Sequence, residues 1–160
     1  QDTGVVAVRY PRGTQNKEIH WPMGYRDYLR FGSESDVLLI SYGRLSEQVY
    51  MAREALRAEQ ISVDMLKLTR LSPLPTDVVE ICKQYSEVLF YEEGIKNGGI
   101  GQQLLLMLHE QGFHGEFHLR GIENFVAQST VNEALADLKL DAVSMVSDVK
   151  VLISDKNDKK

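Results

Sequence analysis

The residues from Val37 to Tyr42 form a nearly continuous apolar run that ends at Gly43. A run without alternation of polar and apolar side chains is typical of a parallel strand buried on both faces. The sequence that follows is apolar at every third or fourth position, which predicts an amphipathic helix. These positions are Leu45, Val49, Ala52 and Leu56. A buried strand followed directly by such a helix begins a βαβ unit, which constrains the chain to an α/β fold.

The same alternation of strands and helices continues along the chain. Further strands are expected at residues 25–31, 61–68, 87–91 and 116–121, the first of them at an edge of the sheet. Helices are expected at residues 76–85, capped by Thr76, and at 102–110, 131–138 and 141–153. We therefore predict one α/β domain with three layers, a mainly parallel sheet with helices on both faces.

Near the amino terminus, a proline and a glycine flank an arginine. Val5 to Tyr10 is a short apolar run rich in β-branched residues, which predicts a buried strand. Pro11 fixes its own φ and Gly13 allows a sharp exit, so Arg12 is expected on a stiff turn at the end of that strand. Its guanidinium group presents five donors in one plane, which suits a phosphate or a carboxylate. An ordinary surface ion pair explains the spacing equally well.

The composition excludes several classes of function. The formal net charge of −5 argues against a nucleic-acid partner, because such surfaces are normally basic. No apolar run approaches the roughly 20 residues that span a bilayer, so no membrane segment is predicted. Cys82 is the only cysteine, so no disulfide can form within the chain and a reducing compartment is favoured. A soluble, cytoplasmic protein is expected.

The two ends of the chain lead to separate predictions. The chain opens at Gln1 rather than at an initiator Met, and a strand-like run follows almost at once. We therefore expect a fragment of a longer protein or a processed product. Residues 154–160 contain no apolar side chain that could be buried, so a disordered tail is expected there.

A glycine-rich loop, residues 94–101, joins an expected strand to an expected helix, where a phosphate-cradling loop would lie. It matches neither the P-loop pattern nor the dinucleotide fingerprint, so we interpret its glycines as allowing a tight turn and close packing. Glu92 and Glu93 precede the loop at the carboxyl edge of the sheet. Adjacent strand residues point to opposite faces, so these two cannot act as a paired acid and base. One of them is expected to cap the following helix or to face a neighbouring domain.

No metal centre and no nucleophilic triad is predicted. The spacing of the histidines fits no metal-binding motif, and the pattern GxSxG does not occur. The histidines are His20, His109, His114 and His118. His109 is expected on a helix and His118 in a strand, and Cys82 on the apolar face of a helix.

Five sequence blocks resemble a known enzyme family. They are "AVRYPRG", "DVLLISYG", "ISVDMLKLTRLSPLP", "VLFYEEGIKNGGIG" and "LKLDA", and they occur in the family's order. Over residues 4–146 the chain resembles the C-terminal part of the 1-deoxy-D-xylulose-5-phosphate synthases, which belong to the thiamine-diphosphate-dependent transketolase family. The arginine-bearing block is the one most specific to the synthases. The later blocks are shared with transketolases and with the β subunits of 2-oxoacid dehydrogenases.

The resemblance implies a role and a division of the chain. Residues 1–13 would end the preceding, pyrimidine-type domain. Residues 14–35 would be a connector with an edge strand, and residues 36–153 the transketolase C-terminal-like domain. The family's enzymes join decarboxylated pyruvate to glyceraldehyde 3-phosphate, and this domain helps to form a homodimer. Arg12 would contact the phosphate of glyceraldehyde 3-phosphate, whereas Arg9 would make a structural ion pair.

The resemblance also implies what this chain lacks. In the family, thiamine diphosphate is held through Mg²⁺ by a Gly-Asp-Gly segment with a following Asn, and a Glu activates its aminopyrimidine. No Gly-Asp-Gly occurs here, and the domain that carries the Glu would precede Gln1. No catalytic, cofactor-binding or metal-binding residue is therefore expected in this chain, which would be inactive alone and would depend on the preceding domains and a second subunit. Three alternatives remain open: a transketolase or 2-oxoacid dehydrogenase β-subunit fragment, against which "AVRYPRG" argues, a nucleotide-binding module, and a stand-alone assembly domain.

Overall fold

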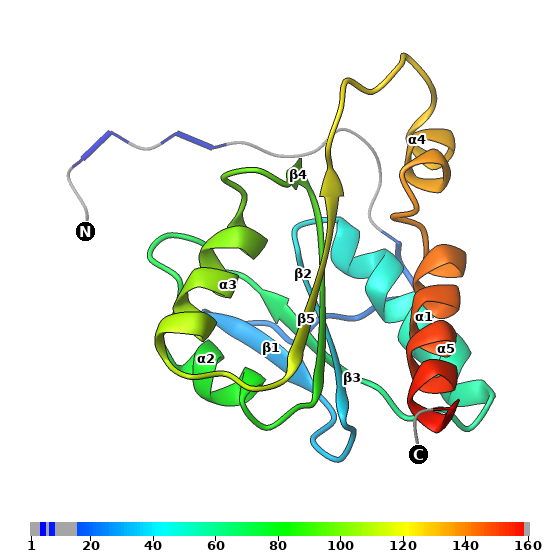
Figure 1. The fold of residues 1–160 in the computed structure, drawn as a ribbon. Helices are drawn as coiled ribbons and strands as arrows, with labels where there is room; N and C mark the ends of the chain where they lie inside the picture. The colour runs from blue at the N-terminus through cyan, green and yellow to red at the C-terminus, as the bar shows by residue number, and fades with distance from the viewer. Residues whose placement is uncertain (1–3, 6, 9–15, 159–160) are drawn as a thin grey trace.

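The computed structural model describes residues 4–5, 7–8 and 16–158. Its centre is a five-stranded sheet with the order β1-β3-β2-β4-β5 (Figure 1). The strands are β1 (Tyr28–Phe31), β2 (Val37–Tyr42), β3 (Asp64–Leu68), β4 (Glu87–Ile95) and β5 (Glu116–Ile122). β1 pairs with β3 in the antiparallel direction, and every other pairing is parallel. β1 is thus an edge strand, as the sequence predicts.

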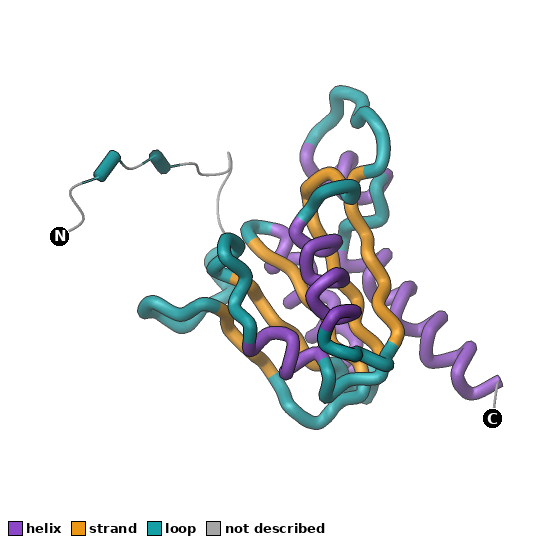
Figure 2. The backbone as a smooth tube through the Cα atoms, turned by 60° about the vertical axis from the view of Figure 1, so that its left-hand side comes forward, coloured by secondary structure: helices purple, strands orange, loops and turns teal. Residues whose placement is uncertain are grey.

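Helices cover both faces of the sheet (Figures 1 and 2). α1 (Leu45–Ala58) and α5 (Ala142–Asp158) pack together on one face, and the short α4 (Val131–Asp137) packs against the same core. α2 (Asp77–Cys82) and α3 (Ile100–Glu110) cover the other face. The predicted three-layer α/β fold is confirmed.

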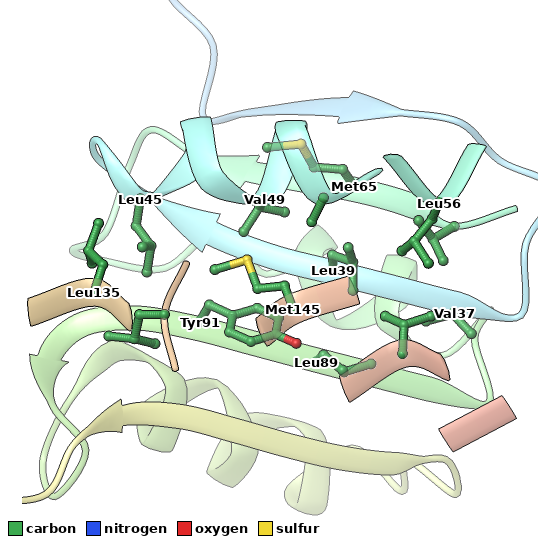
Figure 3. Close-up of a cluster of buried hydrophobic side chains, with 14 residues drawn as sticks. Val37, Leu39, Leu45, Val49, Leu56, Met65, Leu89, Tyr91, Leu135 and Met145 are labelled. Carbon is green, nitrogen blue, oxygen red and sulfur yellow. The ribbon is translucent and has the colours of Figure 1, made fainter. Parts of the chain in front are cut away.

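Strand alternation divides the core between the two faces. Leu39 of β2 faces α1 and α5, whereas its neighbours Leu38 and Ile40 face α2 and α3, and all three are fully buried. Figure 3 shows the first of these clusters, in which Val49 and Met145 from the helices lie over the strands. Truncating one such side chain to Ala typically costs about 2–5 kcal/mol, so both clusters contribute strongly to stability.

The connector before β1 runs along the α1 face. Trp21 packs edge-on against Phe31 of β1 and Tyr50 of α1, with ring centroids 5.9 and 5.6 Å apart. The ammonium group of Lys67 lies 3.7 Å from the centroid of the Trp21 ring. This aromatic cluster fixes the side of the sheet on which the chain enters the domain.

The prediction of a buried strand near the amino terminus is wrong for the part that the structure describes. Val5 and Val8 are exposed and belong to no strand. Among the described residues, neither valine pairs with any of the five strands. The remainder of that run, and Arg12, lie outside the described residues.

The prediction of a disordered tail is wrong for residues 154–158, because α5 continues to Asp158. The sequence argument considered only apolar burial, whereas the anchor is ionic. The ammonium group of Lys156 lies 2.8 Å from a carboxylate oxygen of the buried Glu87 and donates to the hydroxyl of Ser86 at 2.8 Å. Even with this extension, none of the described helices is both long and apolar enough to cross a membrane.

Other boundaries differ in detail. α2 ends at Cys82 rather than near residue 85, and Thr76 lies at its N-cap position without a capping hydrogen bond from its side chain. β1 begins at Tyr28 rather than at residue 25. Each end moves by about three residues, and the order of the elements and their mainly parallel pairing stay as predicted, so these differences leave the architecture unchanged.

Candidate functional site at the carboxyl edge of the sheet

Glu92 lies near the carboxyl end of β4, beside the amino terminus of α3. The register between β4 and β5 shifts between Tyr91 and Ile95, and Glu92 falls within this irregular stretch. Its side chain is fully buried. Its Oε2 atom accepts two hydrogen bonds, one from the backbone N–H of Ile100 at 3.0 Å and one from the hydroxyl of Tyr42 at 3.1 Å. Glu92 therefore caps α3, which confirms one of the two roles predicted for the pair.

The electrostatics of Glu92 combine opposing effects. Burial raises the pKa of its carboxyl group, and hydrogen bonds from Tyr42 and from the backbone N–H groups of Ile100 and Gly101 lower it. The amino terminus of a helix stabilises negative charge, so Glu92 already supplies the anion that this position favours. A phosphate group bound at the same helix end would meet a like charge. The glycine-rich loop is thus not a free phosphate cradle.

Two glycines of the loop allow close packing around this buried carboxylate. A Cβ atom on Gly99 would collide with Glu92 and would lie 2.6 Å from the carbonyl oxygen of Ile95. A Cβ atom on Gly101 would collide with Leu119 and would lie 2.8 Å from the ring of Phe90. The interpretation of residues 94–101 as a packing loop is confirmed by these close approaches.

Glu93 points to the opposite face of the sheet and pairs with Arg44, which precedes α1. The guanidinium group of Arg44 binds both carboxylate oxygens of Glu93, with N···O distances of 2.6 to 3.1 Å. Each glutamate therefore has its own partner on its own side, so the two do not form an acid–base pair. This confirms the argument from strand alternation.

A second charged cluster lies at the opposite edge of the sheet, where β4 and β5 begin. Nε2 of His118 lies 2.8 Å from one carboxylate oxygen of Glu87, and Lys156 binds the other. With Glu116, these side chains bring three groups able to bind a metal within 4.8 Å of one another. The sequence did not predict carboxylate neighbours for His118. The ammonium group of Lys156 already supplies a positive charge to Glu87, which disfavours a metal ion there.

The remaining predicted residues take structural or solvent-exposed positions. His109 lies on α3 and is exposed, as are His20 and His114. Cys82 is fully buried on the apolar side of α2, and burial raises the pKa of its thiol to about 12. A thiol with so high a pKa is a poor nucleophile at neutral pH. Arg12 lies outside the described residues.

Two residues that complete the carboxyl edge, Tyr42 and Arg44, were not predicted from the sequence. Tyr42 is the last residue of β2 and Arg44 follows it by two positions, at the strand end from which side chains reach the ligand-binding edge of an α/β sheet. Their position at the carboxyl end of a predicted strand was the sequence signal that could have identified them. Tyr42 and Glu92 are 50 residues apart in the chain, so only the parallel pairing of β2 with β4 brings them together.

A comparison with known protein families identifies the domain that carries this carboxyl edge. A family model described as "Transketolase, C-terminal domain" matches residues 28–145. The chain belongs to this family. Within this transketolase C-terminal domain, the matched region begins at β1 and ends in α5, so it includes the whole sheet and the carboxyl edge described above.

Curated relatives of this transketolase C-terminal domain carry the name 1-deoxy-D-xylulose-5-phosphate synthase. The protein from Geobacillus thermodenitrificans is 28% identical over 95% of this chain and 25% of its own length. The protein from Bacillus velezensis is 26% identical over 99% of this chain and 26% of its own length. The first form from Geobacter metallireducens is 31% identical over 94% of this chain and 25% of its own length. The chain thus spans about a quarter of the length of these relatives.

Two solved structures share the fold. A split-gene transketolase, described as an inactive β4 tetramer, superimposes with a TM-score of 0.72 at 21% identity over 80% of this chain and 43% of its own. A 2-oxoglutarate:ferredoxin oxidoreductase from Magnetococcus marinus gives a TM-score of 0.56 at 19% identity, over 79% of this chain and 19% of its own. At these identities the likeness concerns the fold.

Two places at the edges of the sheet fit thiamine diphosphate and its metal ion poorly. The amino terminus of α3 already holds the buried carboxylate of Glu92, and in the cluster of Glu87, Glu116 and His118 the ammonium group of Lys156 already pairs with Glu87. Neither place offers an open site for the cofactor.

Proposed function

We propose that this chain is the C-terminal domain of an enzyme of the 1-deoxy-D-xylulose-5-phosphate synthase type. The whole enzyme would join pyruvate, after decarboxylation, to glyceraldehyde 3-phosphate, giving 1-deoxy-D-xylulose 5-phosphate and CO₂ for isoprenoid, thiamine and pyridoxal precursor synthesis. Preceding domains would hold thiamine diphosphate and Mg²⁺, and the enzyme would act as a cytoplasmic homodimer. This domain would support dimer assembly and contribute Arg12.

The observation that carries the proposal is the extent of the match to the synthases. The family model begins at Tyr28, whereas the similarity to the Bacillus velezensis synthase covers 99% of this chain. The similarity therefore extends over the sequence segment around Arg12, which lies before the family domain. A transketolase or a 2-oxoacid dehydrogenase β subunit would share the family domain without this segment.

Arg12 is proposed to bind the phosphate of glyceraldehyde 3-phosphate. A charge-assisted hydrogen bond contributes about 1.5–3 kcal/mol, which corresponds to roughly 10- to 150-fold in KM. In the whole enzyme, we expect Arg12→Ala to raise KM for glyceraldehyde 3-phosphate by that factor and to leave KM for pyruvate unchanged. Arg57→Ala is the matched control, because Arg57 is an exposed arginine on α1, with 73% of its side chain accessible. Equal effects on both substrates would contradict the assignment.

The reading frame upstream of Gln1 tests the proposal before any kinetics. We expect it to encode Gly-Asp-Gly with a following Asn, and then the cofactor-activating Glu. We also expect the 160-residue chain alone to give no turnover with thiamine diphosphate and Mg²⁺. A start codon just before Gln1, or measurable turnover by the chain alone, would overturn the proposal and favour a stand-alone assembly or binding module.

The nucleotide-binding alternative is disfavoured by Glu92. A nucleotide phosphate needs the backbone N–H groups at a helix amino terminus, and at α3 the N–H of Ile100 is bound to Glu92. We expect no shift of thermal unfolding with ATP or NAD. A specific shift with either nucleotide would restore this alternative.

A further inference from the structure

Lys67 lies within the sheet, on β3, and its ammonium group forms no ion pair with any residue that the structure describes. It is the half-buried residue of a strand that is otherwise buried. Four other lysines each have a carboxylate oxygen within 2.9 Å, namely Lys83, Lys96, Lys150 and Lys156. Lys67 therefore combines partial burial with a positive charge that no described carboxylate contacts.

The contact that the structure gives to the Lys67 ammonium group is aromatic. This group lies 3.7 Å from the centroid of the Trp21 ring. Trp21, Phe31 and Tyr50 pack edge to face around one another, with ring centroids 5.6 to 6.0 Å apart. The face of an aromatic ring attracts a cation electrostatically. The aromatic cluster therefore holds the ammonium group without an ion pair.

Burial favours the neutral amine of Lys67. It lowers the pKa of this group, and the charge of Glu47 opposes the shift without cancelling it. The neutral amine of a lysine is its nucleophilic form, and an apolar setting makes that form more accessible. Strand alternation places Lys67 on the same face of the sheet as Met65, which belongs to the α1 core. The position thus provides a nucleophile beside apolar side chains.

The surroundings select the kind of group that Lys67 can accept. A carbamate or a phosphoryl group would bring a negative charge towards Glu47 and into a largely apolar setting, which is unfavourable. An acyl group adds no charge, and its alkyl part suits the aromatic cluster. Partial burial also favours a small donor over a bulky one. We propose that Lys67 is a modification site that accepts a small acyl group from an acyl phosphate.

The reaction needs no oxidant and no metal ion. The nitrogen of the neutral amine attacks the carbonyl carbon of the acyl phosphate, and an N–C bond forms. The C–O bond to the phosphate breaks, and inorganic phosphate leaves with the electron pair. The nitrogen loses one proton to water, so the product is a neutral amide on Lys67.

Acylation alters the contact that holds the connector before β1. The amide carries no charge, so the cation–π attraction between Lys67 and Trp21 is lost. Trp21 keeps its contacts with Phe31 and Tyr50. We therefore expect the connector to stay on the α1 face with its tryptophan less firmly held.

Peptide mapping by mass spectrometry tests the site. The 160-residue chain is treated with acetyl phosphate under native conditions, and the labelling of each lysine is followed over time. We expect Lys67 to be acetylated at least about fivefold faster than Lys150, whose ammonium group is paired with Glu59. Lys150 is the more exposed of the two lysines, so accessibility alone predicts the opposite order.

The same labelling in urea shows whether the fold causes the difference. We expect the two rates to converge in the unfolded chain, where neither the ion pair of Lys150 nor the burial of Lys67 persists. A native rate for Lys67 at or below that of Lys150 would overturn the proposal, as would a preference for Lys67 that is equally large in urea.

Trp21 is the only tryptophan of the chain, so its fluorescence reports the consequence of acylation. After acetylation, we expect acrylamide to quench this fluorescence at least about twofold more efficiently. Lys67→Arg is the matched control, because arginine keeps the charge and is not acylated by this reagent, so treatment should leave its quenching unchanged. An equal rise in Lys67→Arg would overturn the proposal. Neither readout depends on catalysis, so this inference and the proposed enzymatic function can fail independently.

Discussion

At the scale of single residues, Glu92 is the most informative side chain. It is fully buried, it accepts a hydrogen bond from the first turn of α3, and Gly99 leaves the space that it occupies. A buried carboxylate is costly unless it is hydrogen-bonded. Here the helix end and Tyr42 both donate to Oε2, whereas the buried Oε1 has no hydrogen-bond partner among the described residues. Its role is therefore to fix the turn from β4 into α3.

Replacing Glu92 tests this role. Glu92→Ala leaves the N–H of Ile100 without its acceptor, so we expect the free energy of unfolding to fall by about 1–3 kcal/mol. Glu92→Gln keeps an acceptor oxygen, so we expect a loss below about 1 kcal/mol. Urea unfolding followed by circular dichroism measures both. Equal losses would show that the acceptor does not matter.

The raised pKa of Glu92 adds a dependence on pH. Because the folded state binds this proton more tightly than the unfolded state does, stability decreases as pH rises from the ordinary value of 4.5 through the folded pKa. Compared with Glu92→Gln, which lacks this titration, the wild-type chain should therefore gain stability on acidification through that window. If the difference in free energy of unfolding between the wild-type chain and Glu92→Gln stays constant with pH, burial does not raise the pKa of Glu92.

At the scale of elements, apolar periodicity predicts where strands and helices lie. Two local patterns predicted β2 and α1 correctly: the apolar run from Val37 to Tyr42 and the apolar repeat from Leu45 to Leu56. Each pattern depends only on residues that are near one another in the sequence. The last turns of α5 were missed because Lys156 is anchored to Glu87 on a distant strand. The neighbours of Glu92 and His118 were missed for the same reason, since strand pairing is a property of the fold.

Two lysines of α5 provide a matched comparison. Lys156 pairs with Glu87 and Lys150 with Glu59, and both lysine side chains are 43% exposed. Glu87 is 3% exposed and Glu59 50%, so only Lys156→Ala weakens the pairing of a buried charge. After allowance for solvent screening, we expect Lys156→Ala to cost about 1 kcal/mol and Lys150→Ala less than half of that. Hydrogen exchange should also quicken in the last turn of α5 for Lys156→Ala alone.

At the scale of the whole molecule, the sheet separates two cores that can be observed independently. Trp21 packs against the α1 face, and Cys82 lies on the α2 side of the sheet. The strands between them contribute side chains to both cores, so neither core is complete without the sheet. The domain should therefore unfold as one cooperative unit.

The two probes test this cooperativity. We expect Cys82, whose thiol has a pKa raised to about 12 by burial, to resist a thiol reagent at pH 8 without denaturant. In urea, the extent of labelling and the fluorescence of Trp21 should change at the same midpoint. Separate midpoints, or fast labelling of the native chain, would show that the two faces open independently.

The strand order β1-β3-β2-β4-β5 bears on how a growing polypeptide can assemble this sheet. β2, the first of the parallel strands to leave the ribosome, becomes the central strand. β3 then joins one side of it, β4 joins the other, and β5 extends the edge that β4 has left. β1 is synthesised first but pairs with β3, so it can join the sheet only after β3 has been added. Each newly synthesised strand thus finds a free edge, and no completed pairing has to open to admit a later strand.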